Sequence, residues 1–122
     1  MSLHNKSLGS AGESLAVAFL ERQRYRIVER NFRCRGGEID IVARDGKTIV
    51  FVEVKTRTDS RYGPPQLAVT PFKQRQISKA ALTWLAKNRQ LESCARFDVI
   101  SITFSGEQSR IEHIPNAFDL AY

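Results

Sequence analysis

The chain has 122 residues, of which 42% are hydrophobic and 26% charged, so we expect one globular domain, residues 1–122, around one core. The net charge of +6 favours a polyanionic partner, most simply nucleic acid, although many basic proteins bind none. No apolar run approaches the length of a membrane span, and the first residues lack the apolar core of a signal peptide. We therefore expect a cytoplasmic protein without a membrane segment.

The two cysteines, Cys34 and Cys94, lie far apart in the sequence and in no metal-ligand spacing. In a reducing compartment such cysteines are usually free thiols. We expect small buried residues here rather than a disulfide or a zinc site.

The first helix is predicted from about Ser7 or Ser10 to Gln23, after a disordered stretch over residues 1–6. Glu13 then falls in its first turn, where Ser10-Ala-Gly-Glu13 fits a capping box, so the local pattern favours capping over catalysis. Apolar residues at helical spacing define its core-facing stripe: Leu8, Gly12, Leu15, Ala16, Phe19 and Leu20.

A strand is predicted over residues 25–33, where side chains alternate. Around it, residues 22–35 contain one acid, Glu29, and six arginines, at positions 22, 24, 26, 30, 33 and 35. Two interpretations have equal weight: a solvated strand edge guarded by charge, or a surface that contacts phosphates.

A β-hairpin is predicted next, with strands over residues 38–44 and 48–56 joined by Asp45-Gly46. Because side chains alternate between faces, Ile39, Ile41 and Ala43 should share one face. Only a loop with an even number of residues sets this face opposite the valines of the second strand, since a slip of one residue would reverse every side chain.

That register brings Glu38, Asp40, Glu53 and Lys55 onto one patch of the other face, with Asp40 opposite or diagonal to Glu53. Like charges that face each other destabilise a sheet, so a divalent cation is the obvious compensation. Mg²⁺ prefers carboxylate oxygens, and the Val54 carbonyl is a further candidate ligand. Lys55 could orient or deprotonate an attacking water. The alternative is an ordinary solvated acid–lysine pair, worth about 1 kcal/mol at most.

Residues 57–69 are predicted to form a loop that could close over a substrate, and Thr70-Pro71 begins a second helix. Lys73 either extends to solvent at the helix end or reaches a site beside the sheet. We expect Trp84 in the core rather than as a base-stacking platform. The whole predicted buried stripe is Ile77, Ala80, Ala81, Trp84, Leu85 and Asn88.

Residues 96–104 and 110–114 are predicted strands, and residues 116–120 a helical turn. Asp98 is interpreted as a structural partner for an arginine, and His113 as a surface residue. The resulting order, α-β-β-β-α-β-β, predicts an α/β or α+β fold with a sheet flanked by helices.

Asp40 followed by Glu53-Val54-Lys55 resembles the PD-(D/E)xK nuclease motif of the restriction-endonuclease-like fold, although Ile39 stands where the motif has proline. Nearly the whole chain resembles the small bacterial YraN-type family, itself similar to archaeal Holliday junction resolvases. The stretches that carry this resemblance are Gly12-Glu13, residues 37–40, residues 50–57, residues 96–99 and residues 116–118.

The resemblance implies a restriction-endonuclease-like mixed sheet flanked by helices, and a Mg²⁺ or Mn²⁺ site. Because resolvases of this type use an acid from the first helix, it also implies a site role, including metal binding, for Glu13. The leading hypothesis is a metal-dependent endonuclease acting on DNA, including branched or junction DNA. Asp40 and Glu53 would bind the metal and Lys55 would serve the water. The alternative is a non-catalytic nucleic-acid-binding protein that retains the fold.

By analogy with resolvases, a homodimer is also expected. Glu38 and Gln66 are second-rank site candidates. The residues expected to contact nucleic acid are Arg33, Arg35, Arg57, Arg61, Lys73 and Arg75.

Overall fold

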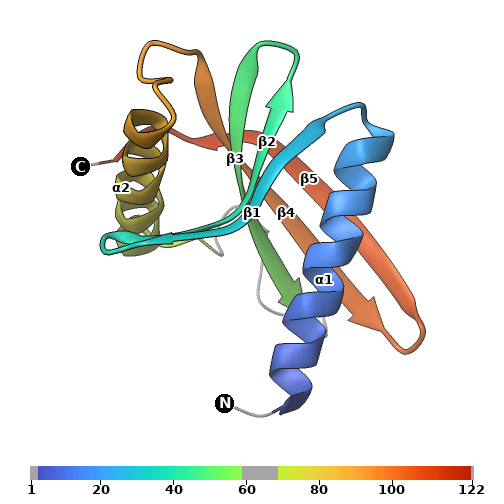
Figure 1. Cartoon of the computed structure of the whole chain (residues 1–122). Helices are drawn as coiled ribbons and strands as arrows, with labels where there is room; N and C mark the ends of the chain where they lie inside the picture. Colours follow the sequence, from blue (N-terminus) through green and yellow to red (C-terminus); the bar gives the residue numbers. More distant parts are fainter. Residues whose placement is uncertain (1–2, 59–68, 122) are drawn as a thin grey trace.

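The computed structural model describes residues 3–58 and 69–121, with side chains from residue 9 onward. Its element order matches the predicted α-β-β-β-α-β-β (Figure 1). The elements are α1 (Leu3–Arg22), β1 (Arg26–Cys34), β2 (Gly37–Asp45), β3 (Thr48–Arg57), α2 (Pro71–Lys87), β4 (Ala95–Ser105) and β5 (Gln108–Phe118).

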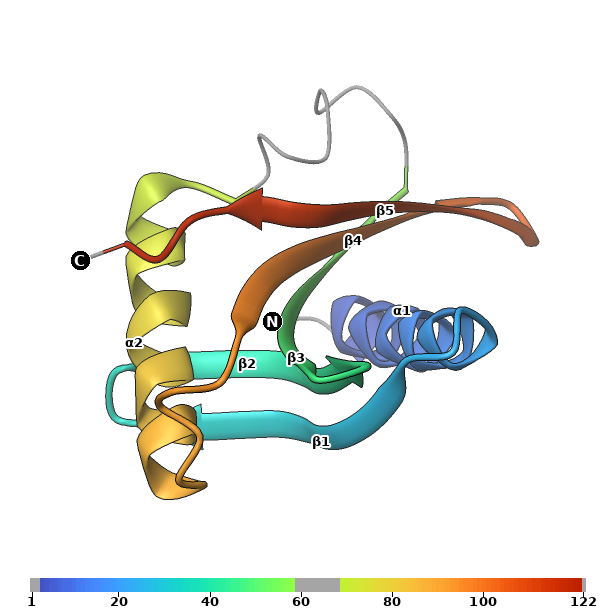
Figure 2. The same ribbon diagram turned by 90° about the horizontal axis from the view of Figure 1, so that it is seen from above.

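The five strands form one mixed sheet in the order β1-β2-β3-β4-β5. Only β3 and β4 are parallel, and α2 lies in the connection between them, as a parallel crossover requires. The two helices lie on opposite sides of the sheet (Figures 1 and 2). Each covers its own apolar cluster, with Ala16 and Leu20 of α1 in one and Ile77 and Trp84 of α2 in the other.

Helix α1 is longer than predicted, because it begins at Leu3. Residues 3–6, which were expected to be disordered, belong to the helix, and residues 1–2 lie outside the described part. Glu13 is therefore in the middle of the helix, and the capping-box prediction is wrong. Gly12 packs directly on β3, since a Cβ at this position would overlap Cγ2 of Thr56.

The β2–β3 hairpin has the predicted even loop. Ile41 pairs with Val52 and Ala43 with Val50. The two-residue turn is Gly46-Lys47 rather than Asp45-Gly46, because Asp45 still pairs with Thr48. Gly46 has φ 62°, a conformation that favours glycine. The side-chain pattern therefore selected the correct register.

The prediction that Ile39 shares a face with Ile41 is wrong. Ile39 packs in the α2 cluster with Phe32, whereas Ile41 packs in the α1 cluster. On the neighbouring strand β1, between the pairs Arg30–Ile41 and Phe32–Ile39, Asn31 has φ 55°, so β1 departs from an extended backbone at the same level. The far end of the β1–β2 pair consequently extends past the sheet to α2 (Figure 2).

Helix α2 begins as predicted, with Thr70 as the N-cap accepting a hydrogen bond from the Lys73 amide at 3.2 Å. Trp84 is a core residue, 2% exposed, and its Nε1 donates to Glu29. Asn88 is not part of the buried stripe, because it is the exposed C-cap of the helix. Ser78 is buried in addition to the predicted stripe.

The C-terminal predictions need two corrections. Strand β5 continues to Phe118, whose ring stacks on Phe97 at 4.9 Å, so residues 116–118 are strand rather than a helical turn. His113 is not a surface residue, since its side chain is 14% exposed and Nε2 lies 2.8 Å from Oδ2 of Asp98. As predicted, Asp98 also binds an arginine, with Arg96 Nε at 3.0 Å.

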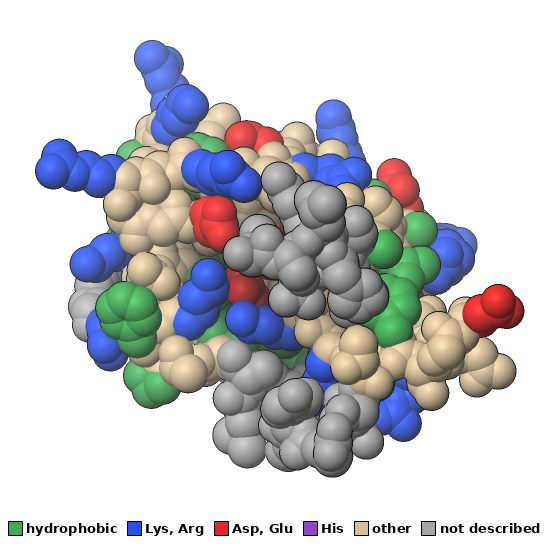
Figure 3. Space-filling model, turned by 90° about the horizontal axis from the view of Figure 1, so that it is seen from below, with side chains coloured by type: hydrophobic (Ala, Val, Ile, Leu, Met, Phe, Trp, Pro, Cys, Tyr) green, Lys and Arg blue, Asp and Glu red, His purple; other side chains and the backbone are tan. Residues whose placement is uncertain are grey.

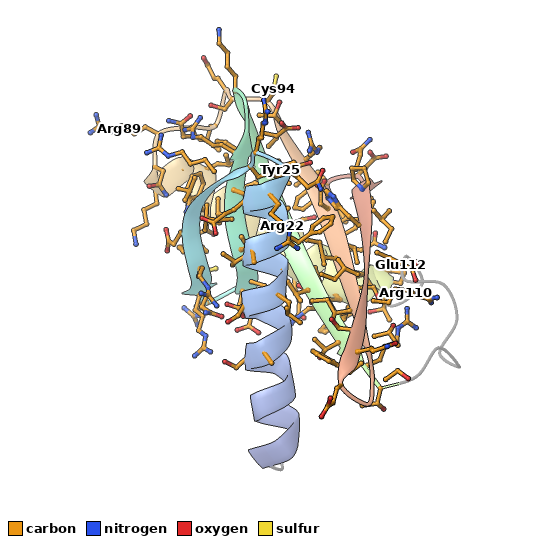
Figure 4. All side chains as sticks on the ribbon, turned by 90° about the vertical axis from the view of Figure 1, so that its right-hand side faces the viewer. Arg22, Tyr25, Arg89, Cys94, Arg110 and Glu112 are labelled. Atoms are coloured by element: carbon orange, nitrogen blue, oxygen red, sulfur yellow. The ribbon has the colours of Figure 1, made fainter. Side chains whose placement is uncertain are left out.

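Tyr25, just beyond the end of α1 (Figure 4), extends this cluster, because its hydroxyl accepts a hydrogen bond from Arg96 at 2.6 Å.

Both cysteines are free, as expected, but neither is fully buried. Cys34 is half-buried, and Cys94 is exposed just before β4. The prediction of buried thiols is therefore wrong.

Candidate functional site

Asp40 and Glu53 lie side by side where β2 and β3 stop pairing. Ile41 and Val52 form the last pair of the ladder, and the two acids are the next residues beyond that pair, one on each strand. There Oδ2 of Asp40 accepts a hydrogen bond from the Val54 amide at 2.8 Å, in place of a backbone carbonyl. Glu53 is buried in the same position, with 6% of its side chain exposed. The structure thus brings together the two carboxylates that the predicted register placed opposite or diagonal to each other.

Burial and neighbouring negative charges raise the pKa of both acids. Burial raises the pKa of Glu53 from 4.5 to about 7, and the neighbouring charge of Asp40 contributes to this rise against the opposing effect of two lysines. Burial also raises the pKa of Asp40, to which the charges of Glu13 and Glu38 contribute, whereas the Val54 amide and Lys73 lower it. Both carboxylates are therefore easier to protonate than free acids.

Two lysines flank Glu53. Lys55, two residues along the same strand, has its Nζ 3.6 Å from Oε1 of Glu53. Lys73, from the first turn of α2, has its Nζ 4.0 Å from the same oxygen. Of the two interpretations of Lys73, the structure therefore supports the one in which it reaches the site. On this face, acidic side chains lie between Lys and Arg side chains (Figure 3).

Glu13 and Glu38 are further carboxylates within electrostatic range of Asp40. Oε1 of Glu13 accepts hydrogen bonds from Asn31 Nδ2 at 2.9 Å and Arg30 Nε at 3.3 Å, both from β1. Glu38 is half-exposed and pairs with Arg33 at 3.4 Å. Glu13 is thus fixed at the edge of the site, while Glu38 faces solvent.

The residues expected to contact nucleic acid are not all in one place. Arg33, Arg35 and Lys73 line a common recess next to the site. Arg75 is exposed on α2, and Arg57 is half-buried and donates to Ser101 of β4 at 3.2 Å. Arg61 and Gln66 lie outside the described residues, as does most of the predicted loop.

Sequence reasoning missed the two residues that hold Glu13. Arg30 was counted only within a basic strand, and Asn31 was not selected. The available signal was the residue type, because asparagine tolerates a positive φ and can end the alternation of a strand. The contact itself joins α1 to β1 across 17 and 18 residues, and no local pattern contains that information.

The donor set suits Mg²⁺ or Mn²⁺. Within residues 3–58 and 69–121, no three His, Cys, Asp or Glu side chains converge to form a closed metal site. Mg²⁺ does not require one, because it is commonly held by one or two carboxylates and completed by waters and substrate phosphate. Asp40 and Glu53 supply such a pair, and a cation there would favour the charged forms that burial and neighbouring negative charges disfavour.

The fold and the site define an α/β protein with a mixed sheet, in which one hairpin carries a buried carboxylate, Glu53, beside the half-buried Asp40, with two lysines next to Glu53. The model of a family described as "Uncharacterised protein family UPF0102" matches residues 12–102. The chain belongs to this family, which confirms the resemblance to the YraN-type family.

Relatives of this chain include a UPF0102 protein of Geobacter metallireducens that is 85% identical over 122 residues and covers 100% of both chains. One from Geobacter sulfurreducens is 71% identical and covers 99% of this chain and 95% of the relative. A more distant one from Anaeromyxobacter dehalogenans is 46% identical and covers 93% of this chain and 85% of the relative. Among the described helices, none combines the length and apolar character needed to cross a bilayer.

Proposed function

We propose that this chain is a metal-dependent endonuclease that hydrolyses phosphodiester bonds in DNA. The observation that carries the proposal is the pair of desolvated carboxylates, Asp40 and Glu53, with lysine Nζ atoms 3.6 and 4.0 Å from Glu53. Two acids buried together raise the free energy of the folded chain unless a cation compensates them. A site that binds a metal and a phosphate would supply this compensation.

In this proposal Asp40 and Glu53 hold Mg²⁺ or Mn²⁺, with the Val54 carbonyl as a third ligand. The metal, when bound, would polarise a phosphoryl oxygen and lower the pKa of a water. Lys55 orients or deprotonates the attacking water, or neutralises charge in the transition state. Lys73 adds positive charge for the phosphate, and Glu13 assists through its charge beside Asp40.

The substrate class is extended to branched or junction DNA on the resemblance to resolvases. The net charge of +6 supports a polyanionic substrate in general. The lysines beside Glu53 and the two arginines of the neighbouring recess, Arg33 and Arg35, support contacts to a phosphate backbone rather than to particular bases.

The test is cleavage of labelled linear, flap and four-way-junction DNA with Mg²⁺ or Mn²⁺. Wild type is compared with Asp40→Asn and Lys55→Ala. In Asp40→Asn the new side chain keeps an oxygen that can accept the Val54 amide, so that this variant separates the charge from the fold. Both variants should lose at least about a hundredfold in rate, within the range of general acid–base and electrostatic effects.

Lys47→Ala is the matched control, because Lys47 is an exposed lysine at the turn of the same hairpin. It should cleave like wild type. Equal cleavage by wild type, Asp40→Asn and Lys55→Ala would refute the site. No cleavage of any substrate, together with salt-sensitive DNA binding, would instead favour the non-catalytic nucleic-acid-binding alternative.

A further inference from the structure

We propose that the basic recess beside the carboxylates, together with the exposed ring of Phe72, binds an unpaired strand of DNA. Phosphate would occupy the recess and a base would stack on Phe72. The inference rests on the proposed function and deepens it, because it specifies a single-stranded segment as the part of the substrate that the protein recognises.

The recess forms where the β1–β2 turn packs against α2. It has a volume of about 310 Å³, which is large enough for a phosphate group. Gly37 makes it possible, since a Cβ there would lie 2.6 Å from the Gln76 carbonyl oxygen. At Gly36 a Cβ would lie 3.2 Å from Cβ of Lys79. The two glycines thus let the turn approach the helix closely.

The charge of the recess suits an anion. Three cationic side chains, Arg33, Arg35 and Lys73, line it with one carboxylate, Glu38. Glu38 pairs with Arg33 at 3.4 Å, and both side chains are at least half-exposed, so the pair is weak and can give way to a phosphate. Arg35 is exposed, and Lys73 also contacts Glu53. Lys73 therefore links the recess directly to the paired carboxylates.

Phe72 directly precedes Lys73, which lines this recess, and it is not one of the buried residues of α2. It is 62% exposed, in contrast to the buried stripe of α2. Helical spacing sets Phe72 on the same face as Gln76, four residues later, and Gln76 lines the recess. Arg75, three residues later, is exposed on the same side.

An exposed aromatic ring beside a cationic groove is the combination that binds single strands. Bases in a duplex are stacked on one another and offer no free face to a side chain, whereas an unpaired base does. The ring of Phe72 is neutral and does not attract phosphate. Contacts to the phosphate backbone of DNA would therefore not give this exposed ring a role, whereas stacking on a base would. Strand ends, flaps and junctions with open arms all supply unpaired bases.

The test is fluorescence anisotropy with a labelled oligothymidylate of about 12 nucleotides, in EDTA so that no cleavage occurs. A blunt duplex of the same length is measured in parallel. Phe72→Ala should weaken single-strand binding about tenfold, as removal of one stacked base does. Phe72→Tyr should bind like wild type, because it keeps an aromatic face.

The salt dependence separates the two parts of the site. Arg35→Ala should reduce the slope of log K against log salt by about 0.7, the value for one phosphate contact on a single strand. Phe72→Ala should leave this slope unchanged. Leu91→Ala is the matched control, since Leu91 is 60% exposed but lies beyond the far end of α2, and it should not change binding.

Phe72→Ala binding like wild type, or losing duplex and single-strand affinity equally, would overturn the inference. Cleavage of DNA without any effect of Phe72 would overturn this inference alone and leave the nuclease proposal intact. Binding that depends on Phe72, without cleavage of any substrate, would support this inference and overturn the nuclease proposal. Thermal melting of each variant verifies that the protein remains folded.

Discussion

The buried Glu53 makes a strong prediction about stability and pH. Its pKa is about 7 in the folded chain, against 4.5 as the ordinary value. An acid whose pKa is higher in the folded state binds its proton more tightly there than in the unfolded state. Its contribution to stability is therefore greatest at low pH. That contribution is lost as the pH rises from 4.5 through 7. At about 1.4 kcal/mol for each pKa unit, the loss is about 3 kcal/mol. With 6% of its side chain exposed, solvent screening reduces this little.

Glu53→Gln removes the charge while keeping the size of the side chain. The free energy of unfolding of the variant, relative to wild type, should therefore rise by about 3 kcal/mol between pH 4.5 and pH 8. The measurement is urea denaturation followed by circular dichroism, in EDTA so that no cation compensates the charge. At pH 8 the variant should be the more stable protein, although it has lost a candidate catalytic residue.

Glu107→Gln is the control, because Glu107 is exposed in the turn between β4 and β5. Its difference from wild type should stay within about 0.5 kcal/mol at every pH. The reasoning is refuted if the difference between Glu53→Gln and wild type changes by less than about 1 kcal/mol over the same range. In that case the folded chain accommodates the ionised acid without cost.

Three further outcomes are expected. Mg²⁺ at about a hundred times its Kd should stabilise wild type by about 2.7 kcal/mol at pH 8, and by less at pH 5.5, because protons compete for the carboxylates there. A melting temperature that does not change with Mg²⁺ at pH 8 would contradict the metal site. Gly12→Ala should lower the free energy of unfolding, measured by urea denaturation, by about 1–3 kcal/mol. Adding Thr56→Ser should restore part of this loss, because it deletes the methyl group that the new Cβ overlaps. An equal loss in the single and the double variant would argue against the contact. Asp98→Ala should lower the free energy of unfolding by about 3–5 kcal/mol in the same assay, because Asp98 is fully buried and is the shared acceptor of Arg96 and His113. A decrease of less than about 1 kcal/mol would show that the cluster is dispensable.

The parts of the fold that sequence predicted well are governed by local rules. The element order followed from periodicity, and the even hairpin loop followed from the valines of β3. Because that register was correct, the pairing of Asp40 with Glu53 was correct as well. A side chain's position within one hairpin depends on few residues, which makes such a site readable from sequence.

The parts that failed depend on contacts between distant residues. Ile39 departs from the alternation of its strand and packs with Phe32 of the neighbouring strand, beside Asn31, which has a positive φ. His113 was interpreted without a partner because Asp98 lies on another strand, 15 residues away. Lys73 remained ambiguous because its approach to Glu53 depends on how α2 crosses the sheet. Local periodicity contains none of these distances.

The hydrogen bond from the Val54 amide to Asp40 has a practical consequence. The amide proton lies on a carboxylate whose charge changes with pH and with any cation bound beside it. Its NMR chemical shift should therefore follow the ionisation of Asp40 directly, without a substrate or an activity. One backbone resonance in the middle of the chain could thus act as an internal indicator of the site's charge, even in a variant that cuts nothing.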